Sequence, residues 1–235
     1  MITPGSEIMP NDPEGIAAEI KRRGITRLCH FTTIDNLSSI LRYGLLSRDH
    51  LLQNGLPFHF NDPSRFDGKT SHICLSVEHP NGYLLADYKS LSTLVDRFMI
   101  LVIEPLVMTS AGTLFTPGNA ATSGIQMDSG LSGLQRLFSK KFLGRNGKPV
   151  VRKSQQPSCP TDIQAEVLIP HHIPRESILG IVTETPDAAS RVKAIINDKK
   201  LVLPVEVKPR FYQRDLQNSF LQYGGVVKLS LSSVG

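Results

Sequence analysis

The stretch CHFTTIDNLSSILRYGLL, residues 29–46, places a histidine where a short apolar strand ends and a helix is about to begin. Thr33 can cap that helix and Gly44 can end it. Four apolar residues recur at the spacing of one helix face: Ile34, Leu37, Ile40 and Leu41. The pattern alone is typical of a histidine packed at a strand end, but a ring presented to a ligand would suit His30 equally.

Helices and strands alternate irregularly around this stretch. Further helices are predicted over 11–24, 81–91, 128–142 and 186–198. Strands are predicted over 25–31, 72–77, 98–105, 161–170, 177–185 and 203–209. The run at 98–105 is almost wholly apolar, so it should be a central strand buried on both faces. Residues 47–71 and 105–127 should be long loops. This order predicts an α+β fold, with one strongly bent sheet or two small sheets flanked by helices.

The length of 235 residues, with 40% hydrophobic residues, fits one domain with a sizeable core. We expect residues 1–214 to form that domain, with 1–24 as a helical lead-in and 215–235 as a polar tail that is partly disordered. No apolar window approaches the ~18 residues of a membrane span, and the N-terminus shows no secretory signal. Three scattered cysteines argue against a disulfide framework or a zinc site. These features predict a cytoplasmic protein without a membrane partner.

A basic stretch at residues 139–153 contains no acidic residue. Its lysines and arginines are Lys140, Lys141, Arg145, Lys148, Arg152 and Lys153. The formal net charge of +5 and the pI near 9.2 permit an anionic partner without demanding one. A solvated surface is the default interpretation of such a stretch, and contact with the phosphates of a nucleic acid is the second.

Two further residues can carry chemistry if they face a cleft. Glu166 falls inside the expected strand QAEVLIP, with Gln164 on the same side. Glutamate is depleted in strands, so either this strand is an edge with a solvated face or Glu166 lines a cleft. There a carboxylate could stabilise a developing cation or deprotonate a nucleophile. Arg65, in the loop NDPSRFDGK, is either solvated or placed to bind a diphosphate or a nucleic-acid backbone.

Taken together, the opening motif CHFTTIDNLSSILRYGLLS, the RFD loop and the strands HICLSV and IQAEVLIP resemble the DarT family. These are bacterial toxins of toxin–antitoxin pairs that ADP-ribosylate bases in single-stranded DNA. The resemblance extends from about residue 25 to about residue 214. It implies an ADP-ribosyltransferase fold, in which two small bent antiparallel or mixed sheets enclose a cleft for the co-substrate NAD.

The resemblance also implies roles for single residues. Glu166 matches the catalytic glutamate, and Arg65 matches a loop arginine that assists catalysis and binds phosphates. His30, Thr32 and Asn36 match the opening motif that lines the NAD pocket. Breaking the bond to nicotinamide leaves an oxocarbenium-like ribose, which a preorganised carboxylate stabilises. This chemistry needs no metal.

The implied substrate is a thymine or a guanine in single-stranded DNA. The loop NDPSRFDGKTSH is less basic and less aromatic than the loop of the thymine-modifying members, which keeps guanine open. An unstacked base is needed, and the basic 140–153 stretch would follow the single strand. The implied protein partner is a macrodomain antitoxin that removes ADP-ribose.

Two rival interpretations remain open. The chain could keep the fold but modify RNA or a protein, or be related to the RNA 2′-phosphotransferases. Alternatively it could be a basic nucleic-acid-binding module without enzymatic activity, in which His30 and Glu166 are structural.

Overall fold

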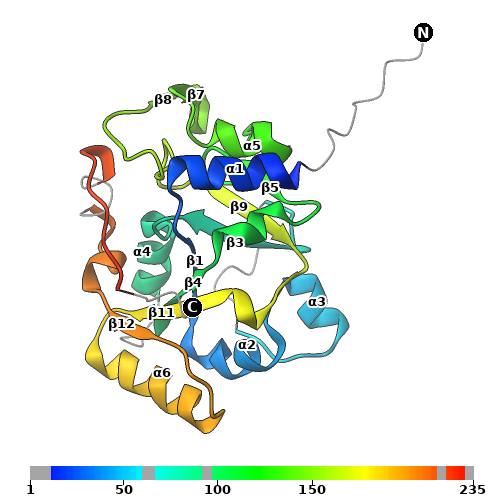
Figure 1. Cartoon of the computed structure of the whole chain (residues 1–235), viewed down its shortest axis with the longest axis vertical. Helices are drawn as coiled ribbons and strands as arrows, with labels where there is room; N and C mark the ends of the chain where they lie inside the picture. Colours follow the sequence, from blue (N-terminus) through cyan, green and yellow to red (C-terminus); the bar gives the residue numbers. More distant parts are fainter. Residues whose placement is uncertain (1–11, 60–66, 92–96, 216–220, 231–235) are drawn as a thin grey trace.

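The computed structural model describes residues 12–59, 67–91, 97–215 and 221–230. Within them, eight strands form one mixed sheet in the order β12-β11-β4-β1-β3-β9-β5-β6 (Figure 1). These strands are β1 (Leu28–Thr33), β3 (His72–Val77), β4 (Phe98–Ile103), β5 (Leu114–Thr116), β6 (Asp128–Ser129), β9 (Glu166–Pro170), β11 (Ile178–Thr183) and β12 (Val205–Val207). Two separate pairs are β2 (Leu45–Leu46) with β10 (His172–Ile173), and β7 (Lys141–Leu143) with β8 (Pro149–Val151).

Helices cover both faces of the sheet (Figure 1). The α-helices are α1 (Pro13–Arg23), α2 (Leu37–Tyr43), α3 (Arg48–Gln53), α4 (Gly82–Leu91), α5 (Gly130–Arg136) and α6 (Pro186–Asp198). The 3-10 helices are η1 (Ile34–Asn36), η2 (Pro105–Thr109), η3 (Arg145–Gly147), η4 (Arg175–Ser177) and η5 (Pro209–Tyr212). None of the described helices is long and apolar enough to cross a membrane.

Two hydrophobic cores lie on opposite faces of the sheet. In β4 all six residues are buried, and alternate ones face the two cores, as expected of a central strand. Met99, Leu101 and Ile103 pack in the larger core with side chains from α1, α2, α5 and α6. The other three residues of β4 pack in the smaller core with Leu85 of α4 and Phe211 of η5.

The sheet is continuous but divided at one short junction. β1 and β3 are paired only at Leu28↔Val77 and Cys29↔Ser76. On its other side β1 pairs with β4 over six residues, while β3 pairs with β9 over five. The expectation of two small separate sheets was therefore wrong, because the two residue pairs of the junction join the halves into one sheet.

Several predicted elements are confirmed. Helix α1 begins after Asp12, whose side chain accepts a hydrogen bond from the Gly15 amide at 2.7 Å, and ends at Gly24 in the left-handed conformation. Helix α6 has the predicted bounds. Helix α2 ends at Gly44, where φ is 78° and a Cβ atom would lie 2.6 Å from the Ile173 carbonyl oxygen. This close approach is what lets β2 pair with β10.

Other predictions were wrong in extent. The loop expected at 47–71 contains α3, which is too short to show a helical repeat. The loop expected at 105–127 contains β5, which gains its partners only from β9 and β6. The helix expected from Asp128 to Phe142 is confined to α5. Its N-cap is Ser129, while the Asp128 carboxylate pairs with Arg136, and Phe142 lies in β7.

A buried polar network ties β1 to the C-terminal segment 221–230. The Arg27 guanidinium donates to the Glu78 carbonyl at 2.8 Å and to the Val227 carbonyl at 2.7 Å, and lies 3.5 Å from the Glu78 carboxylate. Burial raises the pKa of Glu78, against the effect of Arg27. Beside it, burial lowers the pKa of His79 to about 3, so its ring is neutral and Nε2 accepts from the Val227 amide at 3.2 Å.

We predict that Arg27→Leu destabilises the protein by about 3–5 kcal/mol, because it leaves the buried Glu78 without its cation. Urea denaturation measures the change in the free energy of unfolding. The matched control is Arg175→Leu, which removes an exposed arginine paired with Glu176 and should change stability by less than about 1 kcal/mol. Equal small losses in both variants would contradict the structural role of Arg27.

Candidate functional site

A cleft of about 520 Å³ opens where β1 and β3 diverge from their junction. Its walls include residues 29–32 of β1 and 72–76 of β3, together with side chains from α3 and α4. Glu166, the first residue of β9, also lines it. The volume is in the range of pockets that hold cofactors and other small molecules.

His30 lies just beyond the last residue pair that joins β1 to β3. Its Nδ1 is 2.9 Å from the Cys74 carbonyl oxygen, which can only accept a hydrogen bond. Nδ1 must therefore carry the proton, and a neutral ring then has its lone pair on Nε2. The side chain thus spans the gap that the backbone ladder leaves open, and His30 is positioned in the cleft wall.

Asn36 fixes a segment of the cleft wall. Its Nδ2 donates to the Thr32 hydroxyl at 2.9 Å and to the His59 carbonyl at 2.7 Å, while its Oδ1 accepts from the His59 amide at 2.8 Å. All three residues line the cleft. The amide of Asn36 therefore holds the chain around residue 59 against β1.

Glu166 is buried, with 7% of its surface exposed. Its strand lies inside the sheet, where Glu166 has Ser76 of β3 on one side and Thr116 of β5 on the other. The alternative interpretation, an edge strand with a solvated face, was wrong, because β5 covers the edge of β9.

Gln164 does not share the cleft with Glu166, contrary to the predicted strand. The Asp162 side chain accepts from the Gln164 amide at 2.9 Å, and the Ala165 amide donates to the Asp162 carbonyl at 3.0 Å. These bonds form a turn, so β9 begins at Glu166 and not at residue 161 as expected. Gln164 lines a second cavity instead.

Sequence analysis missed four side chains in the cleft wall. Arg48, at the start of α3, is the one lysine or arginine among the described residues that line the cleft. Phe31, Phe58 and Tyr88 supply aromatic surface, and the rings of Phe31 and Tyr88 lie 5.9 Å apart. The predicted Arg65 lies outside the described residues.

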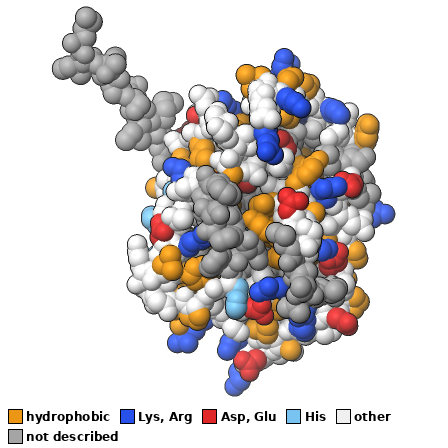
Figure 2. Space-filling model, turned by 180° about the vertical axis from the view of Figure 1, so that it is seen from behind, with side chains coloured by type: hydrophobic (Ala, Val, Ile, Leu, Met, Phe, Trp, Pro, Cys, Tyr) orange, Lys and Arg blue, Asp and Glu red, His pale blue; other side chains and the backbone are white. Residues whose placement is uncertain are grey.

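The basic stretch divides into two groups. Lys140, Lys141, Arg145 and Lys148 are exposed on or beside the β7–β8 hairpin. Lysine and arginine side chains stand at the top of the molecule in Figure 2, the end at which Figure 1 places β7 and β8. These four side chains are available to a ligand on the surface.

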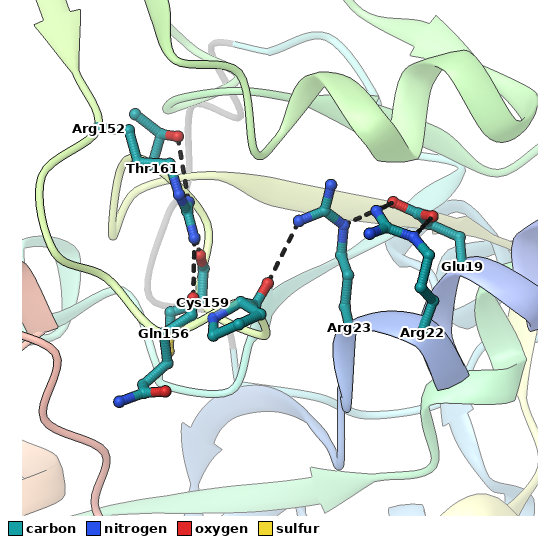
Figure 3. A network of polar contacts seen from close by, with 8 residues as sticks. Glu19, Arg22, Arg23, Arg152, Gln156, Cys159 and Thr161 are labelled. Atoms are coloured by element: carbon teal, nitrogen blue, oxygen red, sulfur yellow. Dashed lines mark hydrogen bonds and ion pairs between the residues drawn. The ribbon is translucent and has the colours of Figure 1, made fainter.

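Arg152 belongs to the other group, because its guanidinium has partners within its own loop. Its guanidinium donates to the carbonyls of Cys159 at 2.9 Å and Gln156 at 2.8 Å, and also contacts the Thr161 hydroxyl (Figure 3). A guanidinium with these partners holds its own loop together. Lys153 is exposed, and its Nζ donates to Gln222 at 2.8 Å.

The described residues contain no cluster of three or more His, Cys, Asp or Glu side chains that could hold a metal ion. Cys29, Cys74 and Cys159 are not in disulfides. Burial raises the pKa of the Cys29 thiol to about 12 and that of Cys159 to about 11, so both are neutral thiols at pH 7.

We predict that Asn36→Ala speeds amide hydrogen exchange at His59, because the variant removes both hydrogen bonds to its backbone. The free energy of unfolding should fall by less than about 1 kcal/mol, since His59 is exposed and water can replace those bonds. Hydrogen exchange read residue by residue measures the first effect and urea denaturation the second. Ser38→Ala, an exposed position of α2, is the control. Unchanged protection of the His59 amide from exchange would contradict the inference that Asn36 holds this segment in place.

Comparisons with solved structures show which fold this is. The Thermosipho africanus protein described as DarTG in complex with ADP-ribose is 20% identical, with a TM-score of 0.60 over 80% of this chain. The chain covers 51% of that DarTG chain. DarT of Thermus sp. 2.9 in complex with NAD+ is 18% identical, with a TM-score of 0.57, and is covered to 97% of its length. The same DarT in complex with ADP-ribosylated ssDNA is 16% identical, with a TM-score of 0.58.

These likenesses show a shared α+β fold. Among curated proteins, none matches the chain. The family model described as "ssDNA thymidine ADP-ribosyltransferase, DarT" matches residues 29–213, which run from the first residue of the opening motif to the residue that follows η5. That span includes the divided sheet, the cleft and Glu166, and it establishes that the chain belongs to the DarT family of ssDNA thymidine ADP-ribosyltransferases.

Proposed function

We propose that the 520 Å³ cleft binds NAD+ and that the chain transfers its ADP-ribose to a base of single-stranded DNA. One observation carries the proposal: His30 and Glu166, 136 positions apart in the sequence, line the same cleft at the junction of the two half-sheets. The family match supports the same activity.

In this proposal the ribose end of NAD+ is bound by His30 and by the part of the cleft wall that Asn36 holds together. The lone pair on Nε2 of His30 can accept a hydrogen bond from a ribose hydroxyl, because Nδ1 is already committed to the Cys74 carbonyl. Thr32 and Asn36 act by positioning the segment at His59. We assign the diphosphate to Arg48 and to Arg65, since guanidinium groups bind phosphates in bidentate geometry.

Glu166 is the proposed catalytic residue. The bond from the anomeric carbon to the nicotinamide nitrogen breaks, its electron pair leaves with nicotinamide, and positive charge develops on the ribose. A carboxylate fixed in a buried cleft stabilises that charge more than one in water does. A ring nitrogen of the base then bonds to the anomeric carbon, and Glu166 accepts the proton that this nitrogen releases. No step in this scheme uses a metal.

The base is proposed to be thymine. The family model is described by its activity on thymidine, which outweighs the loop composition that had kept guanine open. The loop around Arg65 lies outside the described residues, so guanine stays the alternative to be tested. The exposed cations of the β7–β8 hairpin are proposed to contact the phosphates of the strand.

The remaining assignments follow from the family and from chain organisation. We propose a macrodomain antitoxin as partner and a reducing, cytoplasmic environment, in keeping with three cysteines that form no disulfide. The single catalytic domain over residues 1–214 stays a prediction, and the family match supports it by ending at 213. Beyond it, Leu221 is buried, so this part of the expected tail packs on the domain.

We predict that Glu166→Gln lowers the rate of ADP-ribose transfer by about 100- to 10,000-fold, because it removes both the negative charge and the proton acceptor. Transfer of label from NAD+ is measured on oligonucleotides that contain one kind of base, in DNA and in RNA. Thermal unfolding with and without NAD+ checks that the variant still folds and binds.

The control is Glu176→Gln, an exposed glutamate of η4, which should retain the full rate. Label on thymine oligonucleotides supports the proposed base, and label on guanine alone would replace it. If wild-type protein labels no oligonucleotide, the proposed substrate class is wrong.

We predict that changing Lys141, Arg145 and Lys148 together to glutamine lowers the affinity for single-stranded DNA. The affinity should also depend less steeply on salt concentration. For single strands each lost phosphate contact reduces the slope of log K against log salt by about 0.7, so the slope should fall by about 2. Fluorescence anisotropy over a salt series measures it. The matched control changes Lys193, within α6, and Lys199 and Lys200, just beyond its end, on the opposite side of the molecule from β7 and β8 (Figure 1). Equal slopes in both variants would exclude the hairpin from the DNA surface.

A further inference from the structure

The structure contains a second cavity, of about 230 Å³. Its walls come from Val77 at the end of β3, Tyr83 of α4, the loop 150–164 and two residues of the C-terminal segment, Leu221 and Gln222. Among the described residues, none lines both cavities. They are nevertheless close, because Gln164 lines the second cavity and Glu166, two positions later, lines the first.

The side chains of this second cavity include the kinds of group that proteins use to bind nucleotides. Tyr83 supplies an aromatic ring, the usual stacking platform for an unstacked base, and the Arg214 guanidinium lies over this ring at 5.6 Å. Asp162 and Gln164 offer hydrogen-bonding groups to a base edge. Lys153, which also lines the cavity, offers a cation to a phosphate, and it is held in place by Gln222.

Burial raises the pKa of the Asp162 carboxyl, against the hydrogen bond from the Gln164 amide, which lowers it. The carboxyl oxygens can accept hydrogen bonds from N–H groups on a base edge. Oδ1 already accepts from the Gln164 amide, which fixes the orientation of the group.

The loop that forms the cavity wall is rigidly held. Arg152 binds the carbonyls of Gln156 and Cys159, and Arg23 of α1 donates to the Pro157 carbonyl at 3.3 Å (Figure 3). Gln155 donates to the Thr161 carbonyl at 3.0 Å. A cavity braced in this way is formed before a ligand arrives, which lowers the entropy lost on binding.

The C-terminal segment completes the wall. The Ser154 amide donates to the Gln222 carbonyl at 3.1 Å, and the Gln156 side chain donates to the Gly224 carbonyl at 2.7 Å. Further along, Val227 is bound by Arg27 and His79. This segment lies beyond residue 213, the last one that the family model matches.

We propose that the second cavity binds a base of the single-stranded substrate that neighbours the modified base, and that the C-terminal segment is part of this subsite. The proposal rests on the proposed function. The base held here is not the one that reacts, because neither His30 nor Glu166 lines this cavity. A bound neighbour would fix the strand while the reacting base enters the catalytic cleft, and would give the enzyme a preference for sequence context.

The test combines variants of Tyr83 with oligonucleotides that carry one modifiable base and an abasic site at a single neighbouring position. With wild-type protein, one of these positions should lower the transfer rate at limiting DNA by about 5- to 150-fold, the worth of one base–aromatic stack. Tyr83→Leu should show a loss of that size on the intact oligonucleotide and no further loss on the abasic one. Tyr83→Phe keeps the stacking ring and should behave like wild type.

Asp162→Asn gives a second, nearly isosteric test that retains Oδ1 for the Gln164 amide. It should change which neighbouring base is preferred, without changing NAD+ hydrolysis in the absence of DNA. If transfer by wild-type protein is indifferent to abasic neighbours, or if Tyr83→Leu and Asp162→Asn keep the wild-type context preference, the subsite is wrong. Failure of wild-type protein to bind NAD+ or to label any oligonucleotide would instead overturn the proposed function.

Discussion

The two residue pairs that join β1 to β3 are the constraint on which the rest of the site depends. More paired residues between β1 and β3 would leave no gap between these two strands. Without any paired residues, the strands on either side would form two separate sheets. With Leu28↔Val77 and Cys29↔Ser76 alone, the strands are held at one end and diverge from there. The side chain of His30 then bonds to the Cys74 carbonyl, across the gap where further ladder bonds would have formed. The cleft is thus a direct consequence of sheet pairing, and it needs no separate domain to enclose it.

Positively charged side chains that cannot be told apart in the sequence have different structural roles in this fold. Arg27 is buried and holds Glu78 and the C-terminal segment, whereas Arg152 braces the loop 155–161. Arg48 faces the catalytic cleft, and the cations of the β7–β8 hairpin face solvent. The net positive charge is therefore a poor measure of how much of the surface can contact a nucleic acid. Burial and partners decide which cations are available.

The two cavities share a common scaffold on either side of one short segment. The turn at Asp162 ends the braced loop, and β9 begins four residues later with Glu166. A change in the loop therefore bears on both cavities, since the position of Glu166 follows from the turn before it. This arrangement links the wall of the second cavity to the position of the Glu166 carboxylate through one short turn.

The sequence by itself determined the elements whose residues repeat strongly or carry end signals. Helix α1 has its Asp12 cap and its terminal Gly24, and β4 is an unbroken apolar run, so both follow from local rules. The opening motif around His30, the RFD loop and the strands HICLSV and IQAEVLIP together indicated the family. Local chemistry fixes such features because their physical causes lie within a few residues of one another.

Features that depend on contacts between residues far apart in the sequence were decided only by the tertiary structure. The two-residue junction of β1 and β3, the pairing of β5 with β9 and the role of Arg152 each arise from contacts that no local pattern records. The same holds for the second cavity, whose walls join α4, the loop 150–164 and residues 221–222. Side-chain packing and hydrogen bonding between distant segments set these features, because a buried group takes its role from whatever the fold places against it.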